Sequence, residues 1–244
     1  MSNIGLLICV FTLMSITGLA GALLRILSFG TLIPFNQKYL ISWSSRVTLK
    51  MIGMQLELPD WKPSDDRLHF ITFNHNSYLD IFALTALSMP NTRFLLSEKT
   101  IRIIPFTLSA IAIGVYYIPQ QFRPQRRLWF FKKMEKRIKN RQVNIAGSSE
   151  GVHDHHHGID RFNRGVYHMA LVCDMVIDPL YIHIPEESNP FSKYKPFARG
   201  KIQVFKLDSV DTRGWTLEHL DAHKDSVREL YVRKFNALNE KQVS

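Results

Sequence analysis

The alternation of hydrophobic and polar residues along the chain predicts strands and helices in turn. Short runs rich in β-branched and aromatic residues are typical of buried strands, and they lie at 68–73, 92–96, 115–118 and 143–146. Apolar residues recur with the helical period in the segments between these runs, at 80–87, 99–113 and 125–140. Strands that alternate with helices predict an α/β domain with a mainly parallel sheet flanked by helices.

The last third of the chain continues this pattern. It predicts a helix at 166–173, a strand at 175–184 that bends at Pro179, and an alternating strand at 201–207. A charged amphipathic helix is expected at 216–238. Because no internal repeat or low-complexity linker interrupts the pattern, we expect residues 55–244 to form a single domain.

The beginning of the chain has a different character, because residues 4–24 carry no charge. At about 1.5 Å per residue, a helix of this length can cross a hydrocarbon core of about 30 Å. A cleaved signal peptide would begin with basic residues and have a shorter apolar run. Positive-inside bias places the body of the protein in the cytoplasm, because the basic residues nearest to the run all follow it: Arg25, Lys38, Arg46 and Lys50.

A second apolar stretch lies at 39–54. Gly18, Gly21 and Gly30 with Pro34 would let the chain bend, so that the two stretches form a helical hairpin in one leaflet, and a spanning helix is the alternative. We therefore expect residues 1–54 to form an N-terminal membrane-embedded helical segment. Residues 55–244 would then form the catalytic domain.

The formal net charge of +10 is concentrated in one segment. Residues 123–141 carry nine arginines and lysines against a single acid, Glu135, and apolar residues recur there at helical spacing. The outer face of this helix is either simply solvated or binds anionic headgroups or an acidic carrier protein. Nucleic acid is disfavoured as a partner, because no stacking-aromatic or groove-reading motif accompanies the charge.

A candidate for acid–base chemistry follows the first expected strand, in the sequence NHNSYLD at 74–80. On one continuous helix, the side chains of His75 and Asp80 would point about 140° apart. If His75 lies on the turn and Asp80 in the first turn of the next helix, the carboxylate can reach the imidazole. Asp80 would then fix the tautomer of His75, which could act as a general base on a hydroxyl. The alternative is a helix-capping histidine beside a solvated aspartate.

The stretch GSSEGVHDHHHG at 147–158 allows three interpretations. Ser149 has the G-x-S-x-G spacing of a serine nucleophile. The four histidines within 153–157 resemble metal ligands. Glu150 and Gly151 could instead form a binding loop that serves a catalytic histidine elsewhere in the chain.

The surrounding sequence favours the third interpretation. A serine nucleophile needs a helix directly after it, and residues 152–158 lack an apolar stripe, so a serine esterase using Ser149 is kept as the alternative function. Neighbouring histidines on a loop more often contact anions than complete a coordination sphere, and Cys9 and Cys173 offer no ligand spacing. We therefore expect no metal site. A noncatalytic membrane anchor is a third class of function.

Several short blocks occur in an order that is typical of one enzyme family. The segment 74–80 resembles the N-H-x-S-x-x-D block of the glycerolipid acyltransferases, the lysophosphatidic acid acyltransferase family. Later segments are similar to further blocks of this family: GVYYI at 114–118, EG at 150–151, FNRG at 162–165 and VIDPL at 176–180. The apolar N-terminus is also of the kind with which this family binds membranes.

The resemblance implies transfer of a fatty acyl group from a thioester, acyl-CoA or acyl carrier protein, to a hydroxyl of a lysolipid acceptor at the bilayer, on its cytoplasmic side. His75 would be the general base, oriented by Asp80, and no acyl-enzyme would form. Backbone amides near Gly114 or Gly151 would stabilise the oxyanion. No cofactor or metal is implied. The residues implied in substrate binding are Asn74, Ser77, Gly114, Glu150, Gly151, His153 and Arg164.

The chain departs from the pattern of the family at two positions. The third block is commonly F-P-E-G-T-R and the second commonly ends in an arginine or lysine, whereas this chain has His153 and Gln120 there. Because arginine is the usual bidentate ligand of phosphate, these departures favour an acceptor whose head is not a terminal phosphate. Arg123, Arg164 or a protonated His153 could compensate.

Overall fold

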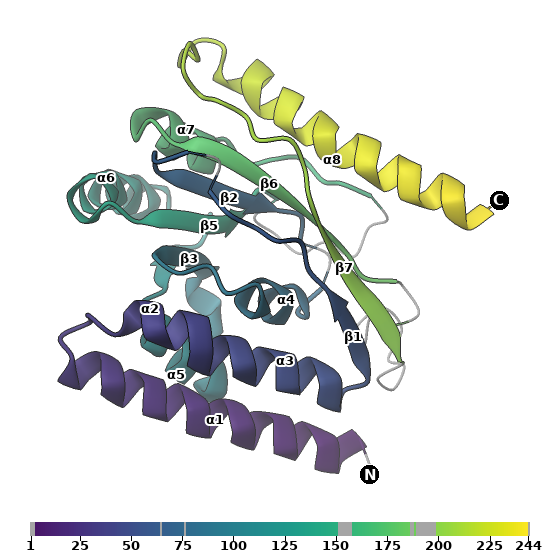
Figure 1. Ribbon diagram of the computed structural model, residues 1–244. Coiled ribbons are helices and arrows are strands. Elements are labelled where there is room, and N and C mark those ends of the chain that lie inside the picture. Colours follow the sequence, from purple (N-terminus) through teal and green to yellow (C-terminus); the bar gives the residue numbers. More distant parts are fainter. Residues whose placement is uncertain are drawn as a thin grey trace.

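Seven strands form one sheet that runs through the protein, with helices on both faces (Figure 1). The computed structural model describes residues 3–63, 65–75, 77–150, 158–185, 188 and 199–243. Within these residues the strand order is β1-β7-β6-β2-β5-β3-β4. The strands are β1 (Met54–Glu57), β2 (His69–Phe73), β3 (Thr92–Ser97), β4 (Tyr116–Ile118), β5 (Asn144–Ser148), β6 (Val176–His183) and β7 (Gly200–Lys206).

The five strands from β2 to β6 run parallel to one another. β2 pairs with β5 and β6, and β3 pairs with β5 and β4, all in parallel. β7 is antiparallel to β6, and β1 is parallel to β7, so these two strands run against the other five. The mainly parallel sheet predicted from the sequence is confirmed, and its five parallel strands all end at the same edge.

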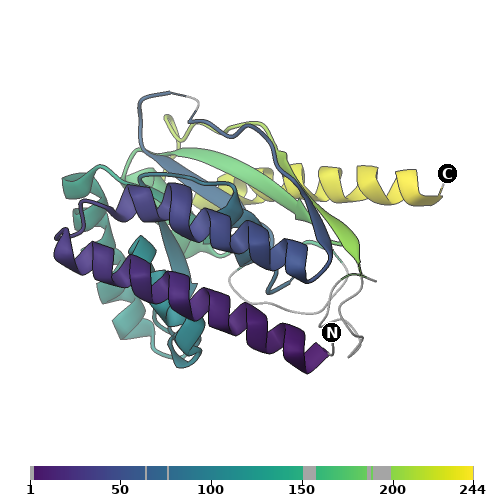
Figure 2. The same cartoon turned by 60° about the horizontal axis from the view of Figure 1, so that its bottom comes forward.

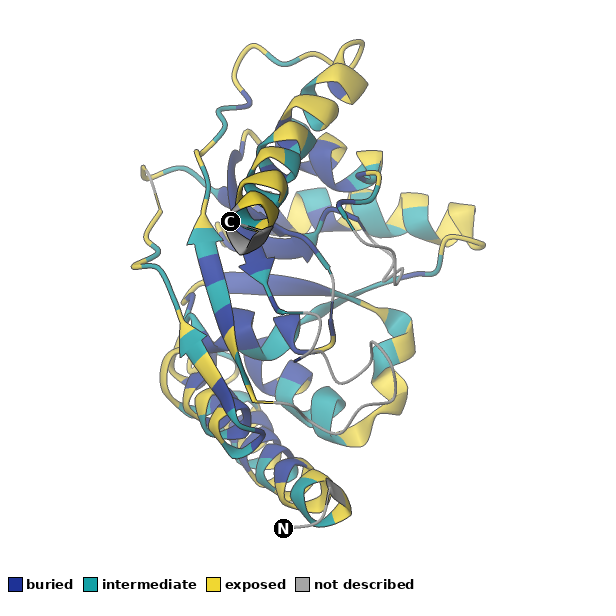
Figure 3. Ribbon diagram, turned by 90° about the vertical axis from the view of Figure 1, so that its right-hand side faces the viewer, coloured by how far each residue is buried: buried dark blue, intermediate teal, exposed yellow. Residues whose placement is uncertain are grey.

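The helices divide between the two faces of the sheet (Figures 1 and 3). α1, α3, α4 and α5 pack together on one face, and α6, α7 and α8 cover the other. The helical elements are α1 (Asn3–Leu27), α2 (Ile33–Phe35), η1 (Asn36–Ile41), α3 (Ser42–Met51), α4 (Asp80–Ala86), η2 (Glu98–Arg102), α5 (Ile104–Ile113), α6 (Pro124–Arg141), α7 (Arg164–Val172) and α8 (Leu220–Val243).

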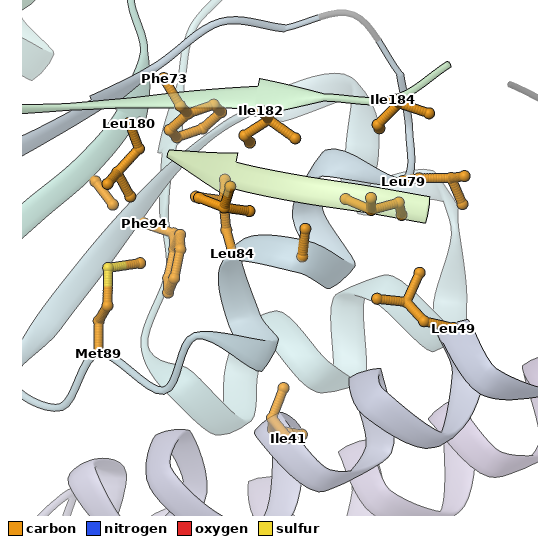
Figure 4. Packing of buried hydrophobic residues seen from close by; sticks show 14 of the residues in the cluster. Ile41, Leu49, Phe73, Leu79, Leu84, Met89, Phe94, Leu180, Ile182 and Ile184 are labelled. Atoms are coloured by element: carbon orange, nitrogen blue, oxygen red, sulfur yellow. The ribbon is translucent and has the colours of Figure 1, made fainter. Parts of the chain in front are cut away.

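β2 is buried along its whole length, because helices cover the sheet on both sides. Phe70 packs into the cluster beneath α6, α7 and α8, whereas Ile71 and Phe73 pack into the cluster on the opposite face. Figure 4 shows Phe73 with Ile182 of β6 and Leu84 of α4 in this second cluster. Burial on both faces explains why the sequence of β2 is continuously apolar rather than alternating.

Two glycines of α1 bring this helix against α5. A Cβ added at Gly18 would lie 2.8 Å from Cβ of Leu108, and one added at Gly21 would lie 2.7 Å from Cβ of Ala112. Because α1 is continuous from Asn3 to Leu27, the expectation that these two glycines bend it is wrong. They permit close approach instead. The chain turns only afterwards, and Figure 2 shows α1 and α3 side by side.

The outer face of α1 is apolar and exposed. The helix is long and apolar enough from Ile4 to Leu27 to cross a membrane, by length and composition, and 33% of its most apolar window is buried. Its exposed side chains include Ile4, Ile8, Ile16, Leu19, Leu23 and Ile26. A contiguous apolar surface of this kind marks contact with a membrane or another protein.

A buried ion pair joins β2 to β6 near the N-terminal ends of the parallel strands. Nδ1 of His69 lies 2.8 Å from Oδ2 of Asp178, and both side chains are fully buried. The hydroxyl of Ser209 donates to Oδ1 of Asp178 at 2.6 Å. Burial lowers the pKa of His69, but the carboxylate of Asp178 and the contacts with Asp65 outweigh burial, so the pKa is raised overall.

Candidate active site

His75 and Glu150 lie side by side where the parallel strands end. β2 ends at Phe73 and β5 ends at Ser148, and these two residues are partners in the register of the sheet. His75 and Glu150 each follow two residues later. The backbone N–H of His75 donates to Oε1 of Glu150 at 3.4 Å. The sheet therefore unites two predicted site residues that are distant in sequence.

Asp80 is the first residue of α4 and holds the imidazole of His75. Nδ1 of His75 lies 2.9 Å from Oδ2 of Asp80. The same oxygen accepts a hydrogen bond of 3.1 Å from the backbone N–H of Ser77. The side chain of Asp80 is 1% exposed and that of His75 is 30% exposed. The imidazole is thus anchored from the buried side and accessible from the other.

The carboxyl group of Glu150 is partly protonated and partly ionised near neutral pH. Burial raises its pKa to about 7, and the negative charge of Asp160 adds to the increase. The hydrogen bond from the backbone of His75 opposes this shift. In its protonated form Glu150 can donate a hydrogen bond to a bound molecule, and in its ionised form it can accept one.

Asn74 holds the end of β2 against β6. Its side chain is fully buried. The side-chain amide donates to the carbonyl of Ile182 at 2.9 Å and accepts from the N–H of Ile182 at 2.7 Å. Ser77, also fully buried, accepts from the N–H of Leu79 at 3.2 Å. These contacts fix the turn that carries His75, so both residues position its imidazole.

Asn163 fixes the turn that carries Glu150. It lies in the FNRG segment, but it was not predicted as a site residue. Its side chain donates to the carbonyl of Glu150 at 2.5 Å, and its backbone N–H donates to the carbonyl of Ser149 at 2.7 Å. Asn163 occupies the N-cap position of α7. The preference of asparagine for this position was the available signal.

Ser149 is buried, and its hydroxyl contacts a phenol rather than a histidine that could activate it as a nucleophile. Its side chain is fully buried, and its hydroxyl lies 2.8 Å from the hydroxyl of Tyr167. Burial raises the pKa of Tyr167, so this phenol stays protonated near neutral pH and does not take up the proton of Ser149. The geometry does not favour the serine esterase.

We expect Ser149→Ala to retain activity within about tenfold of the wild-type rate, because only one buried hydrogen bond, of about 1 kcal/mol, is lost. Tyr167→Phe removes the same hydrogen bond from the other side and is the matched control. Serine-directed phosphonates should leave Ser149 unlabelled in mass spectrometry. Stoichiometric labelling of Ser149 would restore the esterase interpretation.

Gly114 lies near the opposite ends of the strands from His75, so a role of amides near it in the same site stays a prediction without a contact that supports it. The pairing of Leu95 with Tyr116 and the registers of the next strands place Gly114 level with Phe70. β2 continues from Phe70 to Phe73, and His75 lies beyond that end of the strand. Gly114 ends α5 with a φ of +73° and approaches the side chain of Arg93 instead.

Arg164 begins α7, but its side chain turns to α8. Its guanidinium donates to Oδ2 of Asp221 and to the carbonyl of Leu217, both at 3.1 Å. The role of Arg164 in substrate binding therefore stays a prediction without a contact that supports it.

Gln120 lies at the same edge of the sheet as His75, beyond the end of β4. Its amide donates to the hydroxyl of Ser97 at 2.7 Å, and its backbone N–H donates to Glu98 at 3.2 Å. Arg123 also contacts Oε1 of Glu98, at 3.3 Å. The nearby cation that could compensate for Gln120 is therefore already balanced by a carboxylate.

An apolar pocket opens between α1, η1, α4 and α5, beside the turn that carries Asp80. Ile81 and Phe82 line it directly after Asp80, and the other apolar side chains in its wall include Met14, Ile41, Phe106 and Ile113. Four hydroxyl groups, those of Ser44, Ser45, Thr85 and Ser109, are the polar part of the lining.

Gly151 and His153 lie outside the described residues, as do the other histidines of 153–157. Among the residues that the structure does describe, no three His, Cys, Asp or Glu side chains are arranged to hold a metal ion. The interpretations of this segment as a metal site or as a binding loop therefore stay predictions.

Residues 64–183 match the family model described as Acyltransferase, and this range includes His75, Asp80 and Glu150. The chain is 22% identical over 172 residues to acl-2 of Caenorhabditis elegans, a protein named as a 1-acyl-sn-glycerol-3-phosphate acyltransferase. The aligned part is 66% of this chain and 57% of that protein, so the chain spans little more than half of that relative.

A solved structure shares the fold over nearly the whole chain. It is the crystal structure of the 1-acyl-sn-glycerophosphate (LPA) acyltransferase PlsC from Thermotoga maritima. The TM-score is 0.67 at 16% sequence identity, and the match covers 93% of this chain and 95% of that chain.

Proposed function

Because the chain belongs to the acyltransferase family, we propose that it transfers a fatty acyl group from a thioester to a hydroxyl of a lysolipid. The donor would be acyl-CoA or acyl carrier protein. The observation that carries this proposal is the contact of 2.9 Å between Nδ1 of His75 and Oδ2 of Asp80, at the edge of the sheet where Glu150 also lies. A hydroxyl needs a general base to attack a thioester efficiently at neutral pH.

Asp80 would set the protonation of the imidazole. A carboxylate that accepts a hydrogen bond from Nδ1 favours the tautomer in which Nε2 carries the lone pair. Nε2 is then the atom that accepts the proton of the acceptor hydroxyl. Asp80 is well suited to this because Ser77 also binds its Oδ2, so the carboxylate cannot easily rotate away.

The proposed reaction balances without a cofactor, a metal or an acyl-enzyme. As Nε2 of His75 takes the hydroxyl proton, the acceptor oxygen forms a bond to the thioester carbon and an oxyanion develops on the carbonyl oxygen. The carbon–sulfur bond then breaks, and the thiolate leaves with the proton from His75. The products are an ester and a free thiol.

The apolar pocket is our candidate for binding the part of the fatty acyl chain nearest to this chemistry. It begins at Ile81 and Phe82, one and two residues after Asp80, and extends between α1 and α5. Apolar pockets with few polar groups are typical of sites for fatty ligands. The exposed apolar face of α1 supports membrane association, and the basic residues that follow its apolar run support a cytoplasmic active site.

The acceptor that we propose has a head group without a terminal phosphate. A phosphate monoester brings up to two negative charges, and removing its water is costly unless fixed cations replace it. Gln120 is neutral where the family tends to place such a cation, and Arg123 contacts Glu98. Neither of these two described positions therefore offers an unpaired positive charge to a phosphate.

A panel of acceptors tests this proposal. With purified protein in detergent and one acyl-CoA and one acyl carrier protein as donors, a phosphate-free lysolipid should be acylated at least about tenfold faster than lysophosphatidic acid. This factor corresponds to the loss of one charge-assisted hydrogen bond. Gln120→Arg should raise turnover of lysophosphatidic acid, and Gln120→Asn is the matched neutral control.

A preference for lysophosphatidic acid over every phosphate-free acceptor would contradict the proposed head group. If that preference fell as pH rose through about 6 to 7 and vanished in His153→Ala, a protonated His153 would be the missing cation. If it persisted in His153→Ala, other residues would hold the phosphate.

A further inference from the structure

Four arginines gather at the edge of the sheet opposite to His75. They come from three elements that are far apart in sequence: Arg25 from the last turn of α1, Arg93 from β3, and Arg137 and Arg141 from the end of α6. Figure 1 shows the end of α1, α2 and α6 on the same side of the protein, on the left of the view. We refer to these four residues as the arginine cluster.

The end of α5 brings Arg25 and Arg93 together. Arg25 donates to the carbonyl of Ile111, in the last turn of α5. Nε of Arg93 lies beside Gly114, 3.2 Å from where a Cβ would stand. Arg93 is only 7% exposed, so its guanidinium forms the floor of the cluster.

The end of α6 contributes the other two arginines. The guanidinium of Arg137 lies 5.8 Å from the ring centre of Tyr116, the first residue of β4. The side chain of Asn91, just before β3, donates to the carbonyl of Gln142 at 3.0 Å and so ties the end of α6 to the start of β3. Burial lowers the pKa of Arg93, and repulsion by Arg25 and Arg141 lowers it further, so both of these arginines lie near Arg93.

The charge of the cluster is not balanced by carboxylates. Elsewhere in the chain, Arg67 and Arg213 pair with Asp211. Within the described part of the chain, none of the four clustered arginines forms an ion pair with a carboxylate. The carbonyl end of α5 offers only about half of a negative charge. Arg93 is the only buried arginine of the four, and its guanidinium donates to the carbonyl of Thr92. Because this guanidinium cannot lose its proton, its burial is costly without an anion.

We propose that the arginine cluster is a binding site for a phosphate group, distinct from the active site. Guanidinium groups bind phosphate oxygens in bidentate geometry, and several arginines around one buried arginine provide such donors from more than one side. Arg93 forms the floor of the site, Arg137 and Arg141 form its rim on α6, and Arg25 closes it from α1.

The phosphate group could belong to a membrane lipid or to a soluble molecule. Two apolar side chains at the end of α1 are strongly exposed: Leu27, its last residue, at 77%, and Phe29, two residues later, at 96%. They would insert at the level of lipid headgroups if the phosphate belongs to a phospholipid. A soluble phosphate needs no such insertion, so the two sources can be separated by experiment.

The test compares two double variants of the full-length protein in detergent. Arg137→Gln with Arg141→Gln removes two charges from the rim, whereas Arg126→Gln with Lys132→Gln removes two exposed charges from the first half of α6. All four positions are exposed, so both variants should fold. Binding is measured by calorimetric titration with inorganic phosphate and by sedimentation with phosphatidylcholine vesicles with and without phosphatidic acid.

We expect saturable binding that is at least about tenfold weaker in the Arg137/Arg141 variant and unchanged in the Arg126/Lys132 variant. Binding to inorganic phosphate would identify a soluble ligand, and a response limited to vesicles with phosphatidic acid would identify a lipid headgroup. The proposal is overturned if neither probe binds. Equal weakening in both variants would also overturn it, because net charge alone would then explain the binding.

Discussion

Replacing His75 with alanine is expected to lower the rate of acyl transfer by about 10²- to 10⁴-fold while the protein stays folded. His75 supplies the one group that the proposed reaction uses to take up the hydroxyl proton. Its side chain is 30% exposed and contacts Asp80 through one ring nitrogen, so little packing is lost. The rate is measured as ester formation by purified protein, and folding is checked by circular dichroism.

Asp80→Asn should cost less than His75→Ala, because it disturbs the orientation of the imidazole and leaves the base in place. His168→Ala on the exposed side of α7 is the matched control and should retain full activity. Undiminished turnover in His75→Ala would contradict the assignment of His75 as the general base.

His69→Ala is expected to lower the free energy of unfolding by about 3–5 kcal/mol, since it leaves the buried carboxylate of Asp178 without its cationic partner. Both side chains are fully buried, and Asp178 would keep only the hydrogen bond from Ser209 that the structure describes. The measurement is urea denaturation in detergent, with His168→Ala as the exposed histidine control. Equal denaturation midpoints for His69→Ala and wild type would contradict this account.

The same pair predicts a dependence of stability on pH. The pKa of His69 is raised in the folded protein, because Asp178 and Asp65 outweigh the opposing effect of burial. Its contribution is therefore fully present below the unfolded pKa of about 6.5 and is lost as pH rises through the folded pKa. We expect the wild-type protein to lose stability over that interval and His69→Ala to lose less.

Much of the fold could be predicted from the pattern of the sequence. Each predicted strand corresponds to one of the strands from β2 to β7, in order. β1 was missed because it is four residues long and continues directly from the apolar stretch that predicts a helix at 39–54. Its place in the sheet depends on β7, far along the chain, and no local pattern contains that information.

The site could be predicted where its geometry is local. His75 lies on the turn after β2, and Asp80 begins α4. The predicted ends of this strand and this helix were therefore enough to predict their contact. The position of Gly114 relative to His75 could not be predicted, because the order of the family's blocks does not say at which end of a strand a residue lies. Asn163 and the pair of His69 and Asp178 were missed because their partners are remote in sequence.

One experiment can test whether the protein transfers an acyl group directly from a thioester to a lysolipid hydroxyl. The most direct measurement incubates the purified protein with a thioester donor and a lysolipid, and follows free thiol, ester and the mass of the intact protein together. The account predicts one thiol released for each ester formed and no acyl group on the protein. Thiol release without ester, or an acyl group bound to Ser149, would contradict it.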